Sequence, residues 1–441
     1  MNKTTLTFYG GVREVGGNKI LLRDGDTRIF LDFGMSFELR RRYYSDPFLS
    51  PRGKDGLLKF GILPRLRGIY EFEESEPEVD AVFLSHSHMD HAAYISFLKR
   101  SIPIYCGATT ERILKALSDI RAGSLEFNIK GTSLKTFRTG DKVRVGSIEV
   151  EPIHVDHSVP GSYGFLIHTS SGTVVYTGDF RRHGSKPELT EEFIEEAASE
   201  RPSALITEGT NAIGVEVSSE PEVRDKINRI VKDASGLVMA NFAFTDIDRL
   251  RSFYQAAAWN NRYLAITLKQ AYLLSRLSSD PKLEIPRLDD ERLLIFKKTK
   301  KRYYGWEMEA MELGETIDSA HIKRLQSRVI LAISFYDLEE LIGISPVPGS
   351  CYILSASEPF NEEMEIDYEK LVNWLDHYGL PQYHTHVSGH ITPLHLKDTL
   401  RTISPRKIFL IHGTHLELLS RFMDDLDSEI LIPERGVVYE V

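Results

Sequence analysis

The chain has 441 residues, of which 41% are hydrophobic and 27% charged, and its formal net charge is −10. This composition is typical of a folded protein and excludes a mainly disordered, collagenous or coiled-coil chain. Its two cysteines, Cys106 and Cys351, are too few for a disulfide scaffold or a zinc site rich in thiolates. No apolar run approaches the ~18 residues of a membrane helix and no apolar signal core opens the sequence, so we expect a cytoplasmic protein without a membrane partner.

The first third of the sequence reads as short strands separated by glycine-containing turns. Ser170, Ser171 and Gly172 predict a hairpin turn, and helical patterns cover residues 92–99 and 110–122. Strands with interspersed helices predict a layered α/β or α+β arrangement. The β-rich runs are residues 5–9, 19–22, 28–32, 81–84, 142–152, 163–168 and 173–176.

Longer helical patterns alternate with buried strands from about residue 221 to residue 375. The helices are expected at 222–234, 246–259 and 269–277, and the strands at 237–240, 263–266, 329–333 and 351–355. Such alternation predicts a second domain with a parallel sheet. After His390 the chain returns to a helix, a strand at 407–411 and a helix at 416–424. No low-complexity linker separates these regions, which favours a second domain inserted into the first.

Three histidines and one aspartate lie within six positions, one residue past the apolar run 81–84. The motif is His86-Ser87-His88-Met89-Asp90-His91. Neutral imidazoles and carboxylates are good ligands for zinc, so a strand end with this motif predicts a metal site.

Further ligands are expected at other strand ends, where open sheets place active-site groups. His157 follows the run that ends at Pro152, Asp179 follows the run 173–176, and His412 follows the run 407–411. Each alone could equally be a structural turn residue. With the motif they make seven ligands, enough for two metal ions that share a carboxylate.

At this point the sequence resembles the metallo-β-lactamase superfamily, whose most specific motif is HxHxDH. The glycine-rich segment 10–18, followed by Leu31-Asp32-Phe33-Gly34, resembles the start of its β-CASP branch, and especially the ribonucleases J. Residues 205–208, 386–390 and 412–413 are similar to the three later motifs of that branch. The resemblance implies an αββα sandwich with an inserted α/β domain. Its parts would be residues 1–208, 209–384 and 385–441.

The resemblance also implies roles for individual residues. The first ion would be held by His86, His88 and His157, the second by Asp90, His91 and His412, and Asp179 would bridge them. Both ions would be Zn²⁺, with Mn²⁺ as an alternative, and Asp32 would support the metal histidines from behind. The catalytic residues would be Asp179, His390 as general acid or phosphate clamp, and Glu208 orienting that imidazole. His386 and Ser388 would hold a neighbouring phosphate.

Histidine at position 412 resembles the family members that act on RNA, whereas DNA-repair members usually carry valine there. The resemblance therefore implies a zinc-dependent ribonuclease for single-stranded RNA, acting as a 5′-to-3′ exonuclease with endonuclease action as a second mode. Thr414 departs from the glutamate usual after His-Gly, and His415 or Glu417 is the candidate replacement. The sequence resembles the compact, archaeal form, and a homodimer is one assembly left open.

Basic residues concentrate in two stretches. Arg40, Arg41 and Arg42 open the first, and Lys297–Arg302, followed by Tyr303, Tyr304 and Trp306, is the second. A solvated surface is the simpler interpretation of each stretch. Basic residues beside aromatic ones also suit phosphates and bases, and Arg40–Arg42 are the candidate substrate-binding residues.

Two other functions stay open at this level. One is a small-molecule hydrolase of the same superfamily, such as a thioesterase or lactamase. The other is a non-catalytic RNA-binding paralogue. Turnover of nitrocefin or a thioester without RNA cleavage would favour the first, and loss of metal would favour the second.

Overall fold

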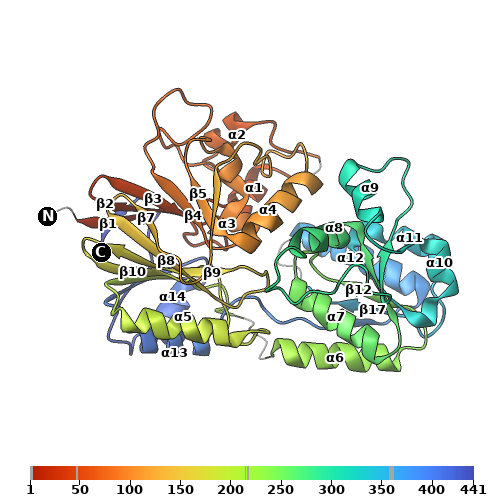
Figure 1. Ribbon diagram of the computed structural model, residues 1–441. Coiled ribbons are helices and arrows are strands. Elements are labelled where there is room, and N and C mark those ends of the chain that lie inside the picture. Colours follow the sequence, from red (N-terminus) through yellow and green to blue (C-terminus); the bar gives the residue numbers. More distant parts are fainter. Residues whose placement is uncertain (1–2, 46–47, 214, 216–217, 357–361) are drawn as a thin grey trace. The chain divides into compact units, whose positions relative to one another are not determined.

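A computed structural model describes residues 3–45, 48–213, 215, 218–356 and 362–441. The chain divides into two compact units, each treated by itself below (Figure 1). Unit 1 comprises Met1–Val215 and Gly389–Val441, and unit 2 is Glu216–Ser388. The sequence places the two crossings slightly earlier, at 208/209 and 384/385.

Among its described residues, unit 1 contains two mixed sheets of seven strands each. In spatial order, the first sheet is β21 (Val438–Glu440), β1 (Thr4–Gly10), β2 (Lys19–Asp24), β3 (Thr27–Leu31), β4 (Ala81–Leu84), β5 (Ile104–Gly107) and β6 (Leu134–Phe137). The second sheet is β20 (Glu429–Leu431), β19 (Lys407–Ile411), β11 (Ala204–Glu208), β10 (Gly172–Tyr176), β9 (Tyr163–Thr169), β8 (Ile148–His154) and β7 (Val143–Val145). The hairpin predicted at 170–172 is confirmed, because β9 and β10 pair in antiparallel fashion with Gly172 opposite Thr169.

The helices of unit 1 are α1 (Phe37–Tyr43), α2 (Lys54–Lys59), α3 (Met89–Ala92), η1 (Ala93–Phe97, a 3₁₀ helix), α4 (Ala108–Ile120), α5 (Pro187–Ser199), α13 (Pro393–Ile403) and α14 (Leu416–Phe422). Two of them begin at a side-chain cap: Ser36 accepts the amide of Leu39, and Thr392 accepts the amide of His395. Such caps satisfy amides that the first turn of a helix leaves unpaired.

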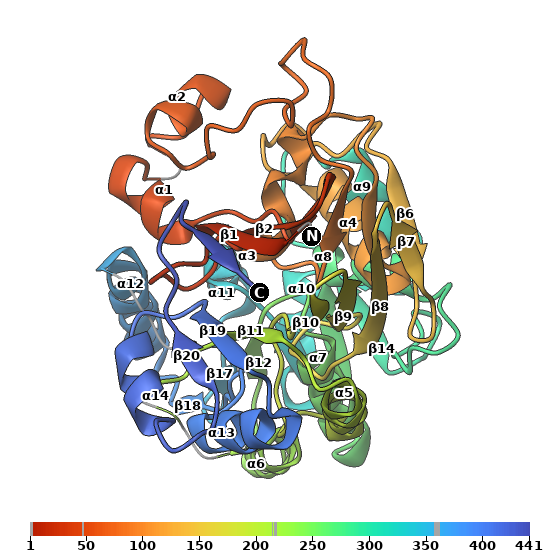
Figure 2. The same ribbon diagram turned by 90° about the vertical axis from the view of Figure 1, so that its left-hand side faces the viewer.

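Three buried clusters define the layers of unit 1. Because neighbouring strand residues point to opposite faces, Phe83 faces the second sheet while Val82 packs with the helices above the first sheet. Leu166 and Leu205 on the outer face of the second sheet pack with α5, α13 and α14. Figures 1 and 2 show the result, two sheets face to face between two helical layers. The expected αββα sandwich is confirmed.

The described part of unit 2 is built on a third sheet of seven strands, and its pairs are parallel, as the alternating pattern predicts. In spatial order the strands are β15 (Thr316–Ile317), β14 (Leu293–Phe296), β13 (Tyr263–Thr267), β16 (Val329–Ala332), β12 (Val238–Asn241), β17 (Cys351–Leu354) and β18 (Gln382–His384). The helices are α6 (Glu220–Asp233), α7 (Ile247–Trp259), α8 (Leu268–Leu277), α9 (Gly305–Met311), α10 (Ser319–Arg324), η2 (Gln326–Arg328), η3 (Phe335–Asp337), α11 (Glu340–Ile344) and α12 (Glu362–Tyr378).

Two expectations about local structure are wrong. The helix expected at 92–99 is only the short α3 followed by η1, because the amide of Tyr94 donates to the carbonyl of Phe33 instead of to its own helix. The single strand expected at 142–152 is the hairpin β7–β8, which turns at Gly146 with φ of 54°. None of the helices in the described part of the chain has both the length and the apolar run that a bilayer crossing requires.

Candidate metal centre

The candidate ligands lie where strands of both sheets of unit 1 end. The HxHxDH motif follows β4, Asp179 follows β10, and His412 follows β19. Glu208 is the last residue of β11, which lies between β10 and β19 and runs parallel to both. The three parallel strands therefore bring Asp179, Glu208 and His412 to one edge of the second sheet.

Asp32, which follows β3 of the first sheet, and His412, which follows β19 of the second, both have left-handed backbones. Asp32 has φ of 57° and His412 has φ of 52°, and the His412 amide donates to the carbonyl of Gly11 at 2.7 Å. Such conformations cost free energy in residues other than glycine and cluster at functional sites. Gly16 lies against Asp90, since a Cβ at this glycine would come within 2.5 Å of the aspartate side chain. The glycine-rich loop thus packs directly on the motif.

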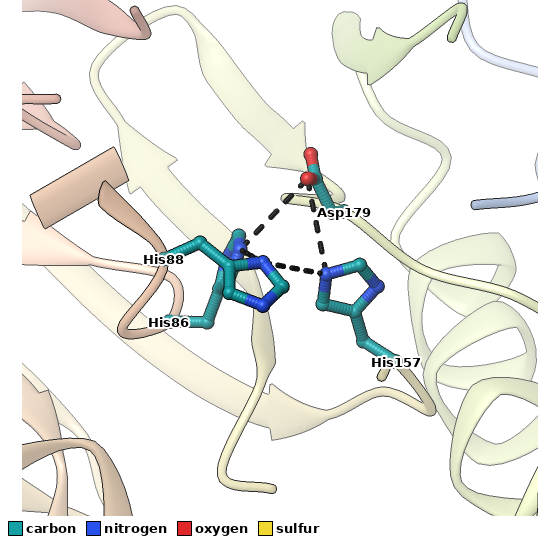
Figure 3. A group of neighbouring side chains, drawn as sticks. All are labelled: His86, His88, His157 and Asp179. Atoms are coloured by element: carbon teal, nitrogen blue, oxygen red, sulfur yellow. Dashed lines mark hydrogen bonds and ion pairs between the residues drawn. The ribbon is translucent and has the colours of Figure 1, made fainter. Parts of the chain in front are cut away.

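The first group consists of His86, His88, His157 and Asp179, whose ligand atoms lie within 4.8 Å of one another. Figure 3 shows them converging from separate segments of the chain. His88 Nδ1 lies 3.0 Å from His86 Nε2 and 3.2 Å from His157 Nε2. Asp179 Oδ2 lies 3.8 Å from His86 Nε2 and 3.9 Å from His157 Nε2.

The second group consists of Asp90, His91, Asp179 and His412, again with ligand atoms within 4.8 Å. His91 Nε2 lies 3.1 Å from Asp179 Oδ2, and His412 Nδ1 lies 3.4 Å from Asp179 Oδ1. Asp179 is common to both groups. The structure thus brings together the seven residues that the sequence singles out, in the two expected sets.

Hydrogen bonds behind the imidazoles fix which nitrogen faces each group. His91 Nδ1 lies 2.7 Å from Asp32 Oδ2, and His157 Nδ1 lies 2.6 Å from the Gly389 carbonyl. Since both oxygens are acceptors, each Nδ1 carries the proton. The Nε2 atoms of His91 and His157 then present lone pairs to the groups. This is how histidines that bind metal are usually supported.

His86 is supported in the same way through Ser85. The Ser85 hydroxyl donates to Asp32 Oδ2 at 2.8 Å, so its oxygen accepts from His86 Nδ1 at 3.0 Å. His86 Nε2 therefore also carries a lone pair.

The residues fit a pair of divalent cations. In the described part of the chain, four buried atoms of the second group have no hydrogen-bond partner, namely His91 Nε2, Asp179 Oδ1, His412 Nδ1 and His412 Nε2. Buried polar atoms are rarely left unpaired, and lone pairs that face each other repel. Cations bound between these atoms would give the unpaired atoms a partner and would remove the repulsion between the lone pairs.

Electrostatics favour neutral imidazoles at most of the histidine ligands, whereas at His91 burial is outweighed by Asp179, Asp32 and Asp90, which raise its pKa well above the usual value. Burial and the neighbouring histidines lower the pKa of His86, and likewise of His412, well below the usual value. The same causes lower the pKa of His157. Burial raises the pKa of Asp179 to about 6, although His91 and His390 oppose the rise. Metal binding requires unprotonated ligands, and a cation would also favour the charged form of this carboxylate.

Glu208 and His390 form a pair beside Asp179. His390 Nδ1 lies 2.8 Å from Glu208 Oε2 and 3.7 Å from Asp179 Oδ2. Glu208 Oε1 accepts the amide of Phe180 at 3.0 Å, so both carboxylate oxygens have partners. Burial alone would lower the pKa of His390, but Glu208 and Asp179 outweigh it and raise this pKa to about 9. Glu208 therefore holds the His390 imidazole, and Asp179, Glu208 and His390 also lie close enough together to form a third possible metal group.

Residues 41–205 match the model of the beta-lactamase superfamily domain. The chain is 24% identical over 430 residues to ribonuclease J 2 of Streptococcus pyogenes, a match that covers 95% of this chain and 71% of the relative. It is 26% identical over 459 residues to ribonuclease J of Thermus thermophilus, covering 98% of this chain and 73% of the relative. The chain is a ribonuclease J-like protein of the metallo-β-lactamase superfamily. The resemblance of its motifs to the β-CASP branch is confirmed.

A solved structure supports the fold independently. It is the crystal structure of a protein of unknown function from Enterococcus faecalis V583, with a TM-score of 0.79 and 23% sequence identity. The match covers 100% of both chains. The fold of the whole chain, including the inserted part, therefore recurs.

The candidate substrate-binding residues differ from one another in exposure and in the unit to which they belong. Arg40 is turned inward: its side chain is only 14% exposed and pairs with Glu126. It therefore does not belong to an exposed phosphate-binding surface, whereas Arg41 and Arg42 of the same helix are exposed. His386 and Ser388 follow β18 and belong to unit 2.

The basic stretch Lys297–Arg302 in unit 2 is partly neutralised. Lys298 pairs with Asp337 at 2.6 Å, and Lys300 pairs with Glu307 at 2.5 Å. These ion pairs favour the interpretation of this stretch as a surface loop tied to its neighbours.

The suggestion that Glu417 takes the place of the glutamate usually found after His-Gly is wrong. Glu417 pairs with Arg13 instead, and His415 is exposed at the start of α14. Neither ring nitrogen of His412 has a hydrogen bond among the described residues.

Sequence reasoning missed the groups behind the ligands. Besides Ser85, Tyr176 donates to Asp32 Oδ2 at 2.6 Å, and Asn18 donates to the Tyr176 hydroxyl at 3.0 Å. Asn18 ends the glycine-rich segment, and Tyr176 ends the strand before Asp179. Polar residues at such positions are the signal that could have identified them.

Asp32→Asn should loosen the metal centre from behind. Asparagine tolerates the left-handed backbone. An amide nitrogen in place of Oδ2, however, is only a donor and cannot accept the hydrogen bond of either His91 or Tyr176. We expect the free energy of unfolding to fall by about 2–4 kcal/mol and metal affinity to fall by roughly 10–100-fold. Denaturant titration and metal titration measure the two effects. The exposed Asp26→Asn is the matched control, and equal behaviour of the two variants would contradict this role.

Proposed function

We propose that this protein is a metal-dependent ribonuclease that hydrolyses phosphodiester bonds of single-stranded RNA as a 5′-to-3′ exonuclease with additional endonuclease action. The observation that carries the proposal is the single carboxylate of Asp179 shared by two convergent histidine groups, with the Glu208–His390 pair beside it. The relatives named ribonuclease J support RNA as the substrate.

In this proposal one ion would be held by His86, His88 and His157 and the other by Asp90, His91 and His412, and Asp179 would be a ligand common to both. Two Zn²⁺ or Mn²⁺ ions bound there would lower the pKa of a water molecule and neutralise phosphodiester charge. The chain's own groups would prepare the site: Asp32, Ser85 and the Gly389 carbonyl keep the imidazole lone pairs aimed inward.

His390 is the proposed proton donor or phosphate clamp. Its side chain is 22% exposed, whereas that of Glu208 is 1% exposed, so the imidazole is the member of the pair that a substrate can reach. Glu208 holds the proton at Nδ1, and Nε2 is then the nitrogen that would donate to the leaving ribose oxygen. His386 and Ser388 are the proposed contacts to a neighbouring phosphate.

Single-stranded RNA should be cleaved at least about tenfold faster than single-stranded DNA of the same sequence, since 2′-hydroxyl contacts let a protein distinguish the two. Denaturing gels of parallel digests with added zinc or manganese measure the ratio. Equal rates, or turnover of nitrocefin or a thioester without RNA cleavage, would contradict the proposal.

One substrate can test direction and mode together. An RNA with distinct 5′ and 3′ labels is digested as its monophosphate and triphosphate forms. The proposed exonuclease releases the 5′ label first as mononucleotide, and endonuclease action gives internal fragments carrying either label. Early release of the 3′ label as mononucleotide would contradict the proposed direction.

A further inference from the structure

The segment that contains α1 and α2 differs in charge from the rest of the chain. Residues 37–67 contain eight lysine and arginine residues against three acidic ones, in a chain whose net charge is −10. The next segment reverses the sign, since residues 71–78 contain five glutamates. Most of the basic side chains are exposed, although Arg40 pairs with Glu126 and Arg67 lies 3.8 Å from Glu78.

This segment starts beside the metal motif. The Met35 amide donates to the carbonyl of Met89 at 3.0 Å, and a Cβ on Gly17 would lie 2.9 Å from Ser36 Cα. Ser36 caps α1, and an α-helix rises ~1.5 Å per residue, so Arg42 lies about 9 Å along the helix from that cap. A polymer bound at the candidate centre could reach the end of α1.

Exposed aromatic rings join α1 to α2 at this end. Tyr43 and Phe60 stack with ring centroids 4.0 Å apart and an interplanar angle of 10°. They remain 41% and 39% exposed, respectively. Arg41 and Lys59, which are near these rings in the sequence, are also exposed. Arg42 pairs with Glu38, but its side chain is still 61% exposed. Together Arg41, Arg42, Tyr43, Lys59 and Phe60 form what we call the α1–α2 patch.

We infer that the α1–α2 patch binds a stretch of single-stranded RNA outside the cleavage site. Cations bind the phosphates of a single strand and aromatic faces stack its bases, in a manner that tolerates any sequence. Arg40 does not contribute, because it pairs with Glu126 inside the unit. The inference rests on the proposed RNA substrate and adds a contact that would favour long RNA over short RNA.

The experiment uses the full chain and two triple variants with equal charge change. The patch variant is Arg41→Gln, Arg42→Gln and Lys59→Gln. The control is Lys142→Gln, Arg144→Gln and Arg401→Gln, whose side chains are 56%, 76% and 58% exposed. Lys142 directly precedes β7, Arg144 lies on β7, and Arg401 lies on α13. Fluorescence anisotropy with labelled oligouridine, longer than the ~4–16 nucleotides typical of single-strand sites, measures binding in EDTA, where metal-dependent cleavage stops.

The patch variant should bind at least about tenfold more weakly than the wild type, and its log–log salt slope should fall by about 2 in magnitude. Tyr43→Ala should weaken binding roughly fivefold or more with little change in that slope. The control variant should resemble the wild type, and circular dichroism checks that each variant folds. The control variant should also cleave RNA at the wild-type rate.

Three results would overturn the inference. The first is equal RNA binding by the patch and control variants. If the wild type still cleaves RNA in that case, the proposed function stands and only the patch inference fails. The second is a change in sedimentation of the patch variant without a change in RNA binding, which assigns the patch to self-association. The third is a wild type that neither binds nor cleaves RNA, in which case the proposed function fails as well.

Discussion

Asp179→Ala should lose bound metal and RNA cleavage together. Asp179 is the residue common to both ligand groups, with Oδ2 3.1 Å from His91 Nε2 and Oδ1 3.4 Å from His412 Nδ1. Without it the first group would have no carboxylate, and Asp90 alone among the ligands would balance two cations. Elemental analysis of protein purified without chelator should give about two ions per chain for the wild type and fewer than one for the variant. RNA cleavage should fall to the background of the assay.

A second buried carboxylate separates loss of metal from loss of the fold. Asp24 is also buried and accepts hydrogen bonds from Thr4 and Ser170, but it belongs to no ligand group. Asp24→Asn should destabilise the protein while it keeps its metal content and activity. An Asp179→Ala protein that retains two ions, or a metal-free wild type that still cleaves RNA, would contradict the assignment.

Much of the candidate site could be predicted because its residues follow hydrophobic strands. The strand expected at 81–84 is β4, and that at 407–411 is β19, so the positions of His86 and His412 at strand ends followed from apolar runs alone. Their convergence depends on the parallel pairing of strands far apart in the sequence. The resemblance to a known family supplied that step, and strand periodicity could not.

The remaining errors come from tertiary contacts. The helix expected after His91 gave way to a 3₁₀ segment because the carbonyl of Phe33 takes the amide of Tyr94. The three adjacent arginines suggest a single basic surface. Arg40 nevertheless turns inward and pairs with Glu126, which lies 86 residues further along the chain. A sequence pattern contains no information on such pairings. The hydrogen bond from His157 to the Gly389 carbonyl spans 232 residues and was equally out of reach.

His390→Ala should separate chemistry from metal binding. His390 Nδ1 lies 2.8 Å from Glu208 Oε2 and 3.7 Å from Asp179 Oδ2. It belongs to neither of the two groups assigned to the ions, although it is a member of the third possible group with Asp179 and Glu208. We therefore expect the variant to keep the fold and both ions. Its RNA cleavage should fall roughly 10²- to 10⁴-fold, the range for a positioned acid.

Glu208→Gln should give a smaller defect of the same kind, because in the proposed mechanism Glu208 acts on the substrate through His390. Residues that act as one unit have non-additive effects, so the double variant should be no slower than His390→Ala alone. Added imidazole should partly restore His390→Ala if the lost function is proton donation, and should not if the lost function is a clamp. The decisive comparison is metal content against turnover across Asp179→Ala, His390→Ala and Glu208→Gln. Loss of zinc from His390→Ala with retention by Asp179→Ala would mean that ligand and acid are exchanged, and near wild-type cleavage by His390→Ala would exclude this histidine from the mechanism.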